Sequence, residues 1–161
     1  LHRSLRRQRQ MCIRDRVSVI HCNNQGPGAN GMPVTGSTAD VTMARYSLLR
    51  HTDAPDDPSG CHFDLLLEDG DACRTWRLQT VPSLGGRPQA AVPLTRHRLV
   101  WLEPRSAAVS GGRGWAERVM AGHFLGQLPH NPTDPVDLSL LDGDLRGQLR
   151  IKQGLCSLRR T

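Results

Sequence analysis

The sequence predicts one small all-β domain, a closed or partly open β-barrel of short antiparallel strands joined by long loops. Three observations support this class. Short apolar runs recur along the chain from Met43 onward, and Gly- and Pro-rich turn signals separate them, as in small barrels and sandwiches. No segment sustains a helical hydrophobic period for more than two turns. The patterned stretch, residues 43–153, is long enough to bury a core without disulfide or metal staples.

The expected strands follow one another along the chain, each bounded by turn residues. Apolar runs predict them at 46–49, 62–68, 72–79, 98–103, 117–121, 136–141 and 145–152. Asp69-Gly70 and Asp142-Gly143 are hairpin signals, because Asp-Gly readily adopts the positive φ angles of tight turns. Stretches rich in Pro and Gly at 52–60, 82–93 and 126–135 predict loops.

Both ends of the chain are expected to lie outside this domain. Residues 1–42 are interpreted as a disordered or artefactual extension, because they are arginine-rich at first and then rich in Gly, Asn, Ser, Thr and Pro. The chain begins with Leu rather than Met, and MCIRDR at 11–16 resembles translated sequencing adapter, so Met43 is a credible start. A basic DNA-binding arm is the alternative for residues 1–16. Residues 154–161 are expected to form a tail.

Charge and cysteine content exclude several classes. The net charge is +6, but residues 1–16 hold six Arg and one Asp, so the remaining chain is close to neutral. Any phosphate-binding surface on the domain must therefore be a local patch. No run of 18 apolar residues exists, which excludes a membrane-spanning helix. The five cysteines form no CxxC pair, which argues against a zinc ribbon or disulfide framework and favours a cytoplasmic protein.

The stretch CHFDLLLE at 61–68 carries the most informative pattern. In a strand, alternate side chains share a face, so His62 and Asp64 lie on one side and Phe63 and Leu65 form a core stripe on the other. An imidazole and a carboxylate about 7 Å apart at their Cα atoms can converge on one divalent ion. His51, at the end of the preceding strand, can supply a third ligand. These ligands do not choose among Zn²⁺, Fe²⁺ and Mn²⁺, and a solvated edge strand is the alternative.

Five short motifs in order resemble a known family. They are Arg50-His51, the block from His62-Phe63-Asp64 to Leu67-Glu68, Thr75-Trp76, the run Arg96-His97-Arg98-Leu99-Val100-Trp101, and Gly143-Asp144-Leu145-Arg146-Gly147. Together they resemble the 3′-phosphoesterase domain found at the N-terminus of bacterial DNA ligase D. The long loop between His51 and His62 resembles the short stand-alone members of that family.

The resemblance implies a metal site and an activity. It implies a Mn²⁺ ion, or Zn²⁺ or another divalent metal, held by His51, His62 and Asp64, with His97 as a catalytic residue that helps to bind the phosphate under attack. The implied activity is the removal of a 3′-phosphate or 3′-terminal ribonucleoside during DNA repair. The implied partners are DNA or RNA–DNA 3′ ends and a DNA ligase, with the protein itself a monomer.

The chain departs from the family pattern at basic positions. The arginine two residues after the metal-binding aspartate is Leu66 here, and a lysine is replaced near Thr80. A further arginine corresponds to Gln89, although Arg87 could substitute for it, and a tyrosine is replaced by Trp101, which can still donate from its indole N–H. Guanidinium–phosphate pairs are strong. The alternative is therefore a catalytically weakened metal-binding relative that acts as a nucleic-acid-end or protein binding module.

Weaker candidates for phosphate binding lie on either side of His97 and in a glycine-rich turn. Arg96 and Arg98 flank His97 and could supply local positive charge, or could simply be solvated. The turn at 110–114 could form an anion-binding nest with Arg113 at its lip, with an ordinary hairpin loop as the alternative. Trp101 joins Arg96, Arg98 and Arg113 as a weak phosphate-binding candidate.

Overall fold

The computed structural model describes residues 43–55 and 57–161, which form almost entirely β structure. The strands are β1 (Met43–Thr52), β2 (Cys61–Asp69), β3 (Ala72–Leu78), β4 (Gln89–Arg98), β5 (Ser106–Ala108), β6 (Trp115–Leu125), β7 (Val136–Leu140), β8 (Gly147–Lys152) and β9 (Leu155–Arg159). One short 3₁₀ helix, η1 (Leu99–Leu102), follows β4. In the part of the chain so described, no helix is long and apolar enough to cross a membrane.

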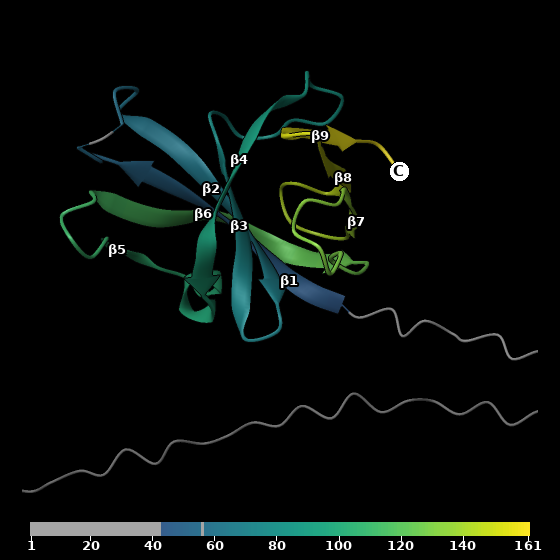
Figure 1. The fold of residues 1–161 in the computed structure, drawn as a ribbon, viewed down its shortest axis with the longest axis horizontal. Coiled ribbons are helices and arrows are strands. Elements are labelled where there is room, and N and C mark those ends of the chain that lie inside the picture. Colours follow the sequence, from purple (N-terminus) through teal and green to yellow (C-terminus); the bar gives the residue numbers. More distant parts are fainter. Residues whose placement is uncertain (1–42, 56) are drawn as a thin grey trace, which may run out of the picture. The chain divides into compact units, whose positions relative to one another are not determined.

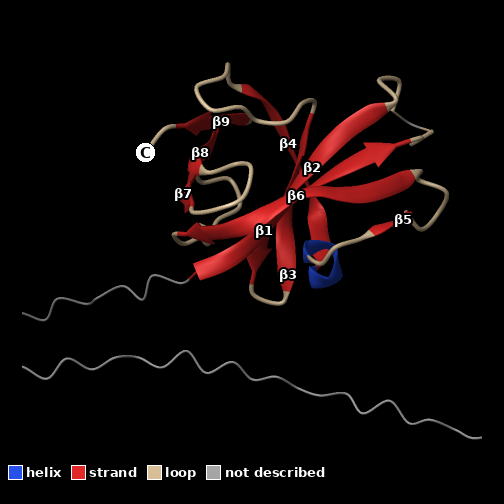
Figure 2. Cartoon of the chain, turned by 180° about the vertical axis from the view of Figure 1, so that it is seen from behind, coloured by secondary structure: helices blue, strands red, loops and turns tan. Residues whose placement is uncertain are grey.

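The strands form one antiparallel sheet that closes on itself. Its order is β1-β2-β3-β4-β9-β8-β7-β6-β5, and an additional pairing of β1 with β6 joins eight strands into a ring (Figures 1 and 2). The pairing is long on both sides of β1 but short between β4 and β9, where only Gln89 and Ala90 have partners. The ring is therefore closed without being a regular barrel. The predicted all-β class is confirmed.

Alternating side chains of the ring build the main core. In β2, Leu65 and Leu67 are fully buried inside it, and Phe63 packs against the same cluster, which confirms the predicted stripe. From the other strands the core includes Tyr46, Leu48, Trp76, Leu78, Phe124, Leu138, Leu149 and Leu158. The opposite face of β2, which carries His62, Asp64 and Leu66, therefore points out of the ring.

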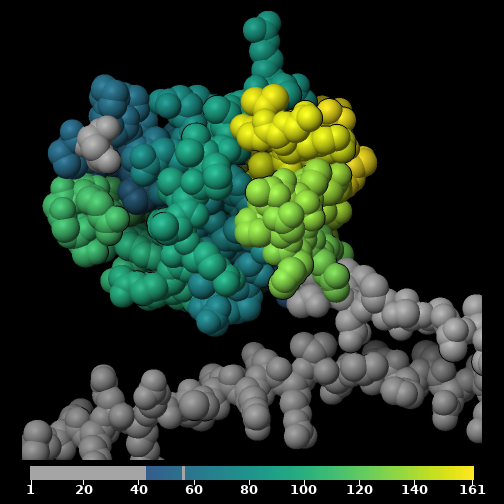
Figure 3. Space-filling view, viewed as in Figure 1, coloured from purple at the N-terminus to yellow at the C-terminus, as the bar shows by residue number. Residues whose placement is uncertain are grey.

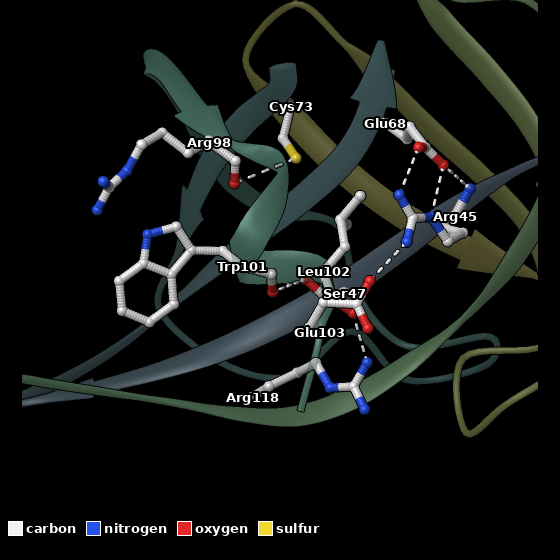
Figure 4. A network of polar contacts seen from close by, with 9 residues as sticks. All are labelled: Arg45, Ser47, Glu68, Cys73, Arg98, Trp101, Leu102, Glu103 and Arg118. Atoms are coloured by element: carbon white, nitrogen blue, oxygen red, sulfur yellow. Dashed lines mark hydrogen bonds and ion pairs between the residues drawn. The ribbon is translucent and has the colours of Figure 1, made fainter. Parts of the chain in front are cut away.

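A second, smaller cluster covers part of that outward face. We call it the outer cluster; it consists of Leu49, Leu66, Cys73, Trp101, Leu102 and Ala116. The part of the outer cluster that lies farthest from the ring is η1. Ser47 donates a hydrogen bond to the carbonyl oxygen of Trp101, and Arg118 donates one to the carbonyl oxygen of Leu102, so η1 is bound to the sheet (Figure 4). The outward face of β2 is thus a covered surface rather than a solvated one.

The structure corrects the expected strand at 98–103. A strand is present earlier, at Gln89–Arg98; it begins inside the stretch 82–93 that was expected to be a loop and runs beyond it, and residues Leu99–Leu102 form η1. Trp101 and Leu102 are consecutive and both buried in the outer cluster, with 9% and 3% exposure. A strand would turn these two side chains to opposite faces, whereas the tight turn of a 3₁₀ helix lets both pack against the outward face of the sheet.

The structure also corrects the domain boundary expected at residue 153. Residues 154–161, expected to be a tail, include β9, which pairs with β8 and with the start of β4. The yellow C-terminal segment lies against the body of the domain in Figure 3. Gln153 and Gly154 have φ angles of 51° and 73° and make a two-residue hairpin turn. Cys156 and Leu158 are buried in the core, with 1% and 2% exposure. The extension expected at residues 1–42 lies outside the described residues.

Candidate metal centre

The pairing of β1 with β2 brings two histidines and one aspartate together. His51 and His62 are directly opposite each other in the antiparallel register, and their rings stack with centroids 5.0 Å apart. Asp64 lies two residues along β2 and therefore shares the face of His62. All three side chains are buried, with exposures of 7%, 2% and 1% for His51, His62 and Asp64.

The ligand atoms of the three side chains converge. One ligand atom from each lies within 4.8 Å of those of the other two. Nε2 of His51 is 3.1 Å from Oδ2 of Asp64, and Nε2 of His62 is 3.9 Å from Oδ1 of the same carboxylate. Ligands about 2 Å from one divalent ion stand at comparable separations from each other. The group could therefore hold a divalent metal ion.

The hydrogen bonding of these atoms fits that chemistry. Nε2 of His51, Nε2 of His62 and Oδ1 of Asp64 are buried and have no hydrogen-bond partner within the described part of the chain. Buried polar atoms without partners are costly and uncommon, so a group of three that faces one point requires an explanation. A cation bound at that point would satisfy all three atoms together.

The protonation state of His51 also suits a metal ligand. Burial lowers the pKa of His51 below its usual value of 6.5, although the nearby carboxylate of Asp64 raises it in part. A lowered pKa keeps the imidazole neutral at physiological pH, and only the neutral ring offers a lone pair to a metal.

We call the three converging side chains, of His51, His62 and Asp64, the ligand group. The ligand group forms part of the floor of a cavity of about 530 Å³, which we call the site cavity. Five arginines line it: Arg77, Arg96, Arg98, Arg105 and Arg113. Asp64 is the one carboxylate among the lining residues. A larger cavity of about 790 Å³ lies along Arg74, Trp76 and Pro129, away from the ligand group. The basic cavity at the ligand group is the one suited to an anionic ligand.

The other residues expected at the site lie in the same cavity. His97 is partly buried, with Nδ1 at 2.9 Å from the carbonyl oxygen of Thr95 and Nε2 at 3.9 Å from Oδ2 of Asp64. Trp101 forms part of the wall, with the guanidinium of Arg105 5.1 Å from its ring centroid. Arg98 and Arg113 also line the cavity, and neither forms an ion pair with a described residue.

Arg96 differs from the other expected arginines, because its charge is already matched. Its Nη2 lies 3.0 Å from Oδ2 of Asp69 and also donates to the carbonyl oxygen of that residue. This pairing ties the end of β4 to the turn between β2 and β3. Arg96 therefore lines the cavity, but its guanidinium is already paired with Asp69.

Three contacting residues were missed by sequence reasoning. Arg77 places Nε 3.5 Å from Oδ1 of Asp64, and Asp57 accepts a hydrogen bond from Nδ1 of His62. The turn signal at Asp69-Gly70 did not suffice to find Arg77, because the turn lies at Gly70-Asp71: this register sets Arg77 opposite Asp64, whereas a turn at Asp69-Gly70 would set Thr75 there. Asp57 and Arg105 lie in loops, whose path no local pattern predicts.

Comparison with known proteins adds no assignment. No protein-family model and no curated protein matches this chain. The geometry of the site cavity and the motifs in the sequence are therefore the evidence for its function.

Proposed function

We propose that this protein is a metal-dependent phosphoesterase that processes the 3′ ends of nucleic acid, removing a 3′-phosphate or a 3′-terminal ribonucleotide in DNA repair. The observation that carries the proposal is that three buried ligand atoms, one each from His51, His62 and Asp64, converge without a hydrogen-bond partner on the floor of an arginine-lined cavity. A cation site beside several guanidinium groups suits a substrate whose reacting group is a phosphate.

The arginines support an anionic substrate. Arg98, Arg105 and Arg113 line the cavity and have no carboxylate partner among the described residues. Like charges gathered around one space repel each other, and a bound phosphate would relieve that repulsion. Guanidinium groups also match phosphate oxygens with paired hydrogen bonds. The preference for a nucleic-acid 3′ end is supported by the five motifs in the sequence.

The residues of the site have distinct parts in the reaction. His51, His62 and Asp64 would hold the metal, which supplies charge neutralisation and polarises a phosphoryl oxygen when bound. The carbonyl of Thr95 accepts from Nδ1 of His97, which leaves Nε2 facing the cavity. When protonated, that nitrogen donates to a phosphate oxygen or to the leaving oxygen. Arg98, Arg105 and Arg113 bind the remaining phosphate oxygens.

A second candidate is a binding module that keeps the metal but does not turn over substrate. The observation in its favour is Leu66, which stands where the family has an arginine and is fully buried in the outer cluster. It offers no charge to a phosphate. Arg77 reaches Asp64 from the neighbouring strand and is the nearest available replacement.

Turnover of an end-labelled primer tests the proposal. We expect the full chain with Mn²⁺ to convert a primer ending in a 3′-phosphate or a 3′-ribonucleotide to a 3′-hydroxyl, the end that a DNA ligase partner seals. His62→Ala should lose both metal binding and product. His130→Ala, which alters an exposed histidine outside the site cavity, should keep both. Metal binding without product would favour the binding module, and absence of metal binding would overturn both candidates.

A further inference from the structure

The loop between β1 and β2 places a carboxylate behind one of the two histidines. Oδ2 of Asp57 is hydrogen-bonded to Nδ1 of His62. The other ring nitrogen, Nε2, points the opposite way and lies 3.9 Å from Oδ1 of Asp64. Asp57 is therefore outside the ligand group, yet it contacts one of its members through the nitrogen that the metal would not use.

Asp57 is itself held in place by its own loop. The backbone N–H and the hydroxyl of Ser59 donate to Oδ1 of Asp57, over 2.9 and 2.6 Å. The backbone of Asp57 also bonds Ala54 and Gly60, which builds a turn on either side. The two carboxylate oxygens thus have different partners: Oδ1 accepts hydrogen bonds from Ser59 of the same loop, and Oδ2 accepts one from His62.

We propose that Asp57 is a positioning residue that keeps the proton of His62 on Nδ1 and so directs the bare Nε2 at the metal. The proposal rests on the metal centre of the proposed function. An ionised carboxylate only accepts hydrogen bonds, so the nitrogen that faces it must carry the proton. A neutral imidazole has one such proton, which leaves the lone pair on Nε2. Carboxylate partners of this kind fix the tautomer and ring orientation of metal-binding histidines.

The two histidines differ in this respect. Within the described residues, His51 contacts a carboxylate only at Asp64, through Nε2, on the side of the ligand group. Asp57 therefore acts on His62 and not on His51. Removing its carboxylate should change the tautomer of one ring and leave the other as it was.

The tautomer can be measured without metal. In the ¹⁵N-labelled full chain, long-range ¹H–¹⁵N correlation spectra in mildly alkaline buffer report which ring nitrogen carries the proton. We expect His62 of the wild type to be protonated at Nδ1. Asp57→Ala should shift it toward Nε2 or to a mixture. Asp57→Asn should also shift it toward Nε2, because the single amide oxygen is held by the N–H of Ser59 and the NH₂ group then faces Nδ1 as a donor. Asp53→Asn alters an exposed carboxylate of the same loop and should change nothing.

Metal affinity supplies the second readout. Titration with Co²⁺, followed by its visible absorption, should show Asp57→Ala binding about 10- to 100-fold more weakly than wild type. Asp57→Asn should also bind more weakly than wild type, because it cannot accept from Nδ1 while its oxygen is held by Ser59. Ser59→Ala, which removes one of the two hydrogen bonds to Oδ1 of Asp57 and keeps the carboxylate, should lose less affinity than Asp57→Ala. Asp53→Asn should bind as wild type does. Thermal unfolding of each metal-free variant checks that the fold is kept.

The outcomes separate this inference from the proposed function. A wild-type protein that binds no metal would overturn the metal-dependent function, while the tautomer spectra would still decide the role of Asp57. A wild-type His62 protonated at Nε2 would overturn the role of Asp57. So would an Asp57→Ala variant that loses affinity while keeping the wild-type tautomer, since Asp57 would then act in another way. If Asp57→Ala does not fold, Asp57→Asn and Ser59→Ala carry the comparison.

Discussion

Leu66 lies two residues after Asp64 on β2 and shares its outward face. It has no exposed surface, because η1 covers it and Leu49, Cys73 and the other members of the outer cluster surround it. Leu66 therefore packs beneath η1, whose Trp101 forms part of the wall of the site cavity. This explains why a guanidinium could not simply be placed there in this chain: η1 would have to move away first.

Leu66→Arg should therefore destabilise the protein rather than improve it. A buried, unpaired guanidinium costs on the order of 3–5 kcal/mol in the free energy of unfolding. Leu66→Met keeps the volume and should cost less than about 1.5 kcal/mol. Urea unfolding of both variants measures the difference. An Arg variant as stable as the Met variant would show that η1 leaves the sheet easily.

His51 gives the stability of the metal-free protein a pH dependence. Burial lowers the pKa of His51 in the folded state below 6.5, so below that pH the unfolded chain binds the additional proton. The free energy of unfolding should therefore fall as the pH falls from 6.5 toward the folded pKa. His51→Gln removes this group and should flatten the dependence in that range. Urea unfolding at a series of pH values provides the measurement, and equal slopes for the two proteins would contradict it.

At the scale of elements, the segment that joins η1 to β6 closes one side of the site cavity. It contains β5, which pairs with β6, and a glycine turn that carries Arg113. Gly114, with a φ of 82°, lies against the end of β1: a Cβ there would stand 2.2 Å from the carbonyl oxygen of Thr52. This close approach sets how near the turn comes to His51.

Gly114→Ala should open this side of the cavity and destabilise the domain. Gly112→Ala is the matched control, because Gly112 also has a positive φ of 67° but has free space around its Cβ position. The control should cost about 1–2 kcal/mol for the backbone conformation alone. Gly114→Ala should cost about 1–3 kcal/mol more, since it adds a steric clash. Chemical denaturation measures the free energy of unfolding of the two variants. Equal values would contradict the steric clash expected at Gly114.

At the scale of the whole molecule, β9 is the strand that completes the ring. It pairs with β8 along its length and meets β4 at only two residues, so it joins the two halves of the sheet. Cys156 and Leu158 contribute buried side chains to the same core as Leu65 of the site strand. The candidate metal centre therefore depends on a segment far from it in sequence.

Truncation after residue 153 should abolish cooperative unfolding. Each large buried apolar side chain contributes about 1.5–3 kcal/mol, and a domain is stable by only about 5–15 kcal/mol in total. Removing β9 also leaves the edges of β8 and β4 without partners. Removing only residues 160–161, which are exposed, should leave the transition unchanged. Differential scanning calorimetry would contradict the expectation if the shorter chain melted as the full chain does.

The local part of the site could be predicted because it depends on local geometry. His62 and Asp64 share a face through the two-residue period of a strand. Arg77 could not be placed in the same way, because the turn lies at Gly70-Asp71, one residue later than the signal at Asp69-Gly70, and this one-residue shift changes which residue of β3 faces Asp64. Asp57 could not be predicted, because its place beside His62 depends on the path of a loop. The strand Leu155–Arg159 was missed, although its alternation and the preceding glycine indicated a hairpin.

The sequence by itself determined that this protein is an all-β domain and that His62 and Asp64 lie side by side on β2, because alternation and hairpin turns are properties of short stretches of chain. Only the tertiary structure decided that this face is covered by η1, that five arginines gather over it, and that Asp57 stands behind His62. These features depend on how the ring closes and where its loops return, and contacts between distant segments follow from packing the whole chain at once.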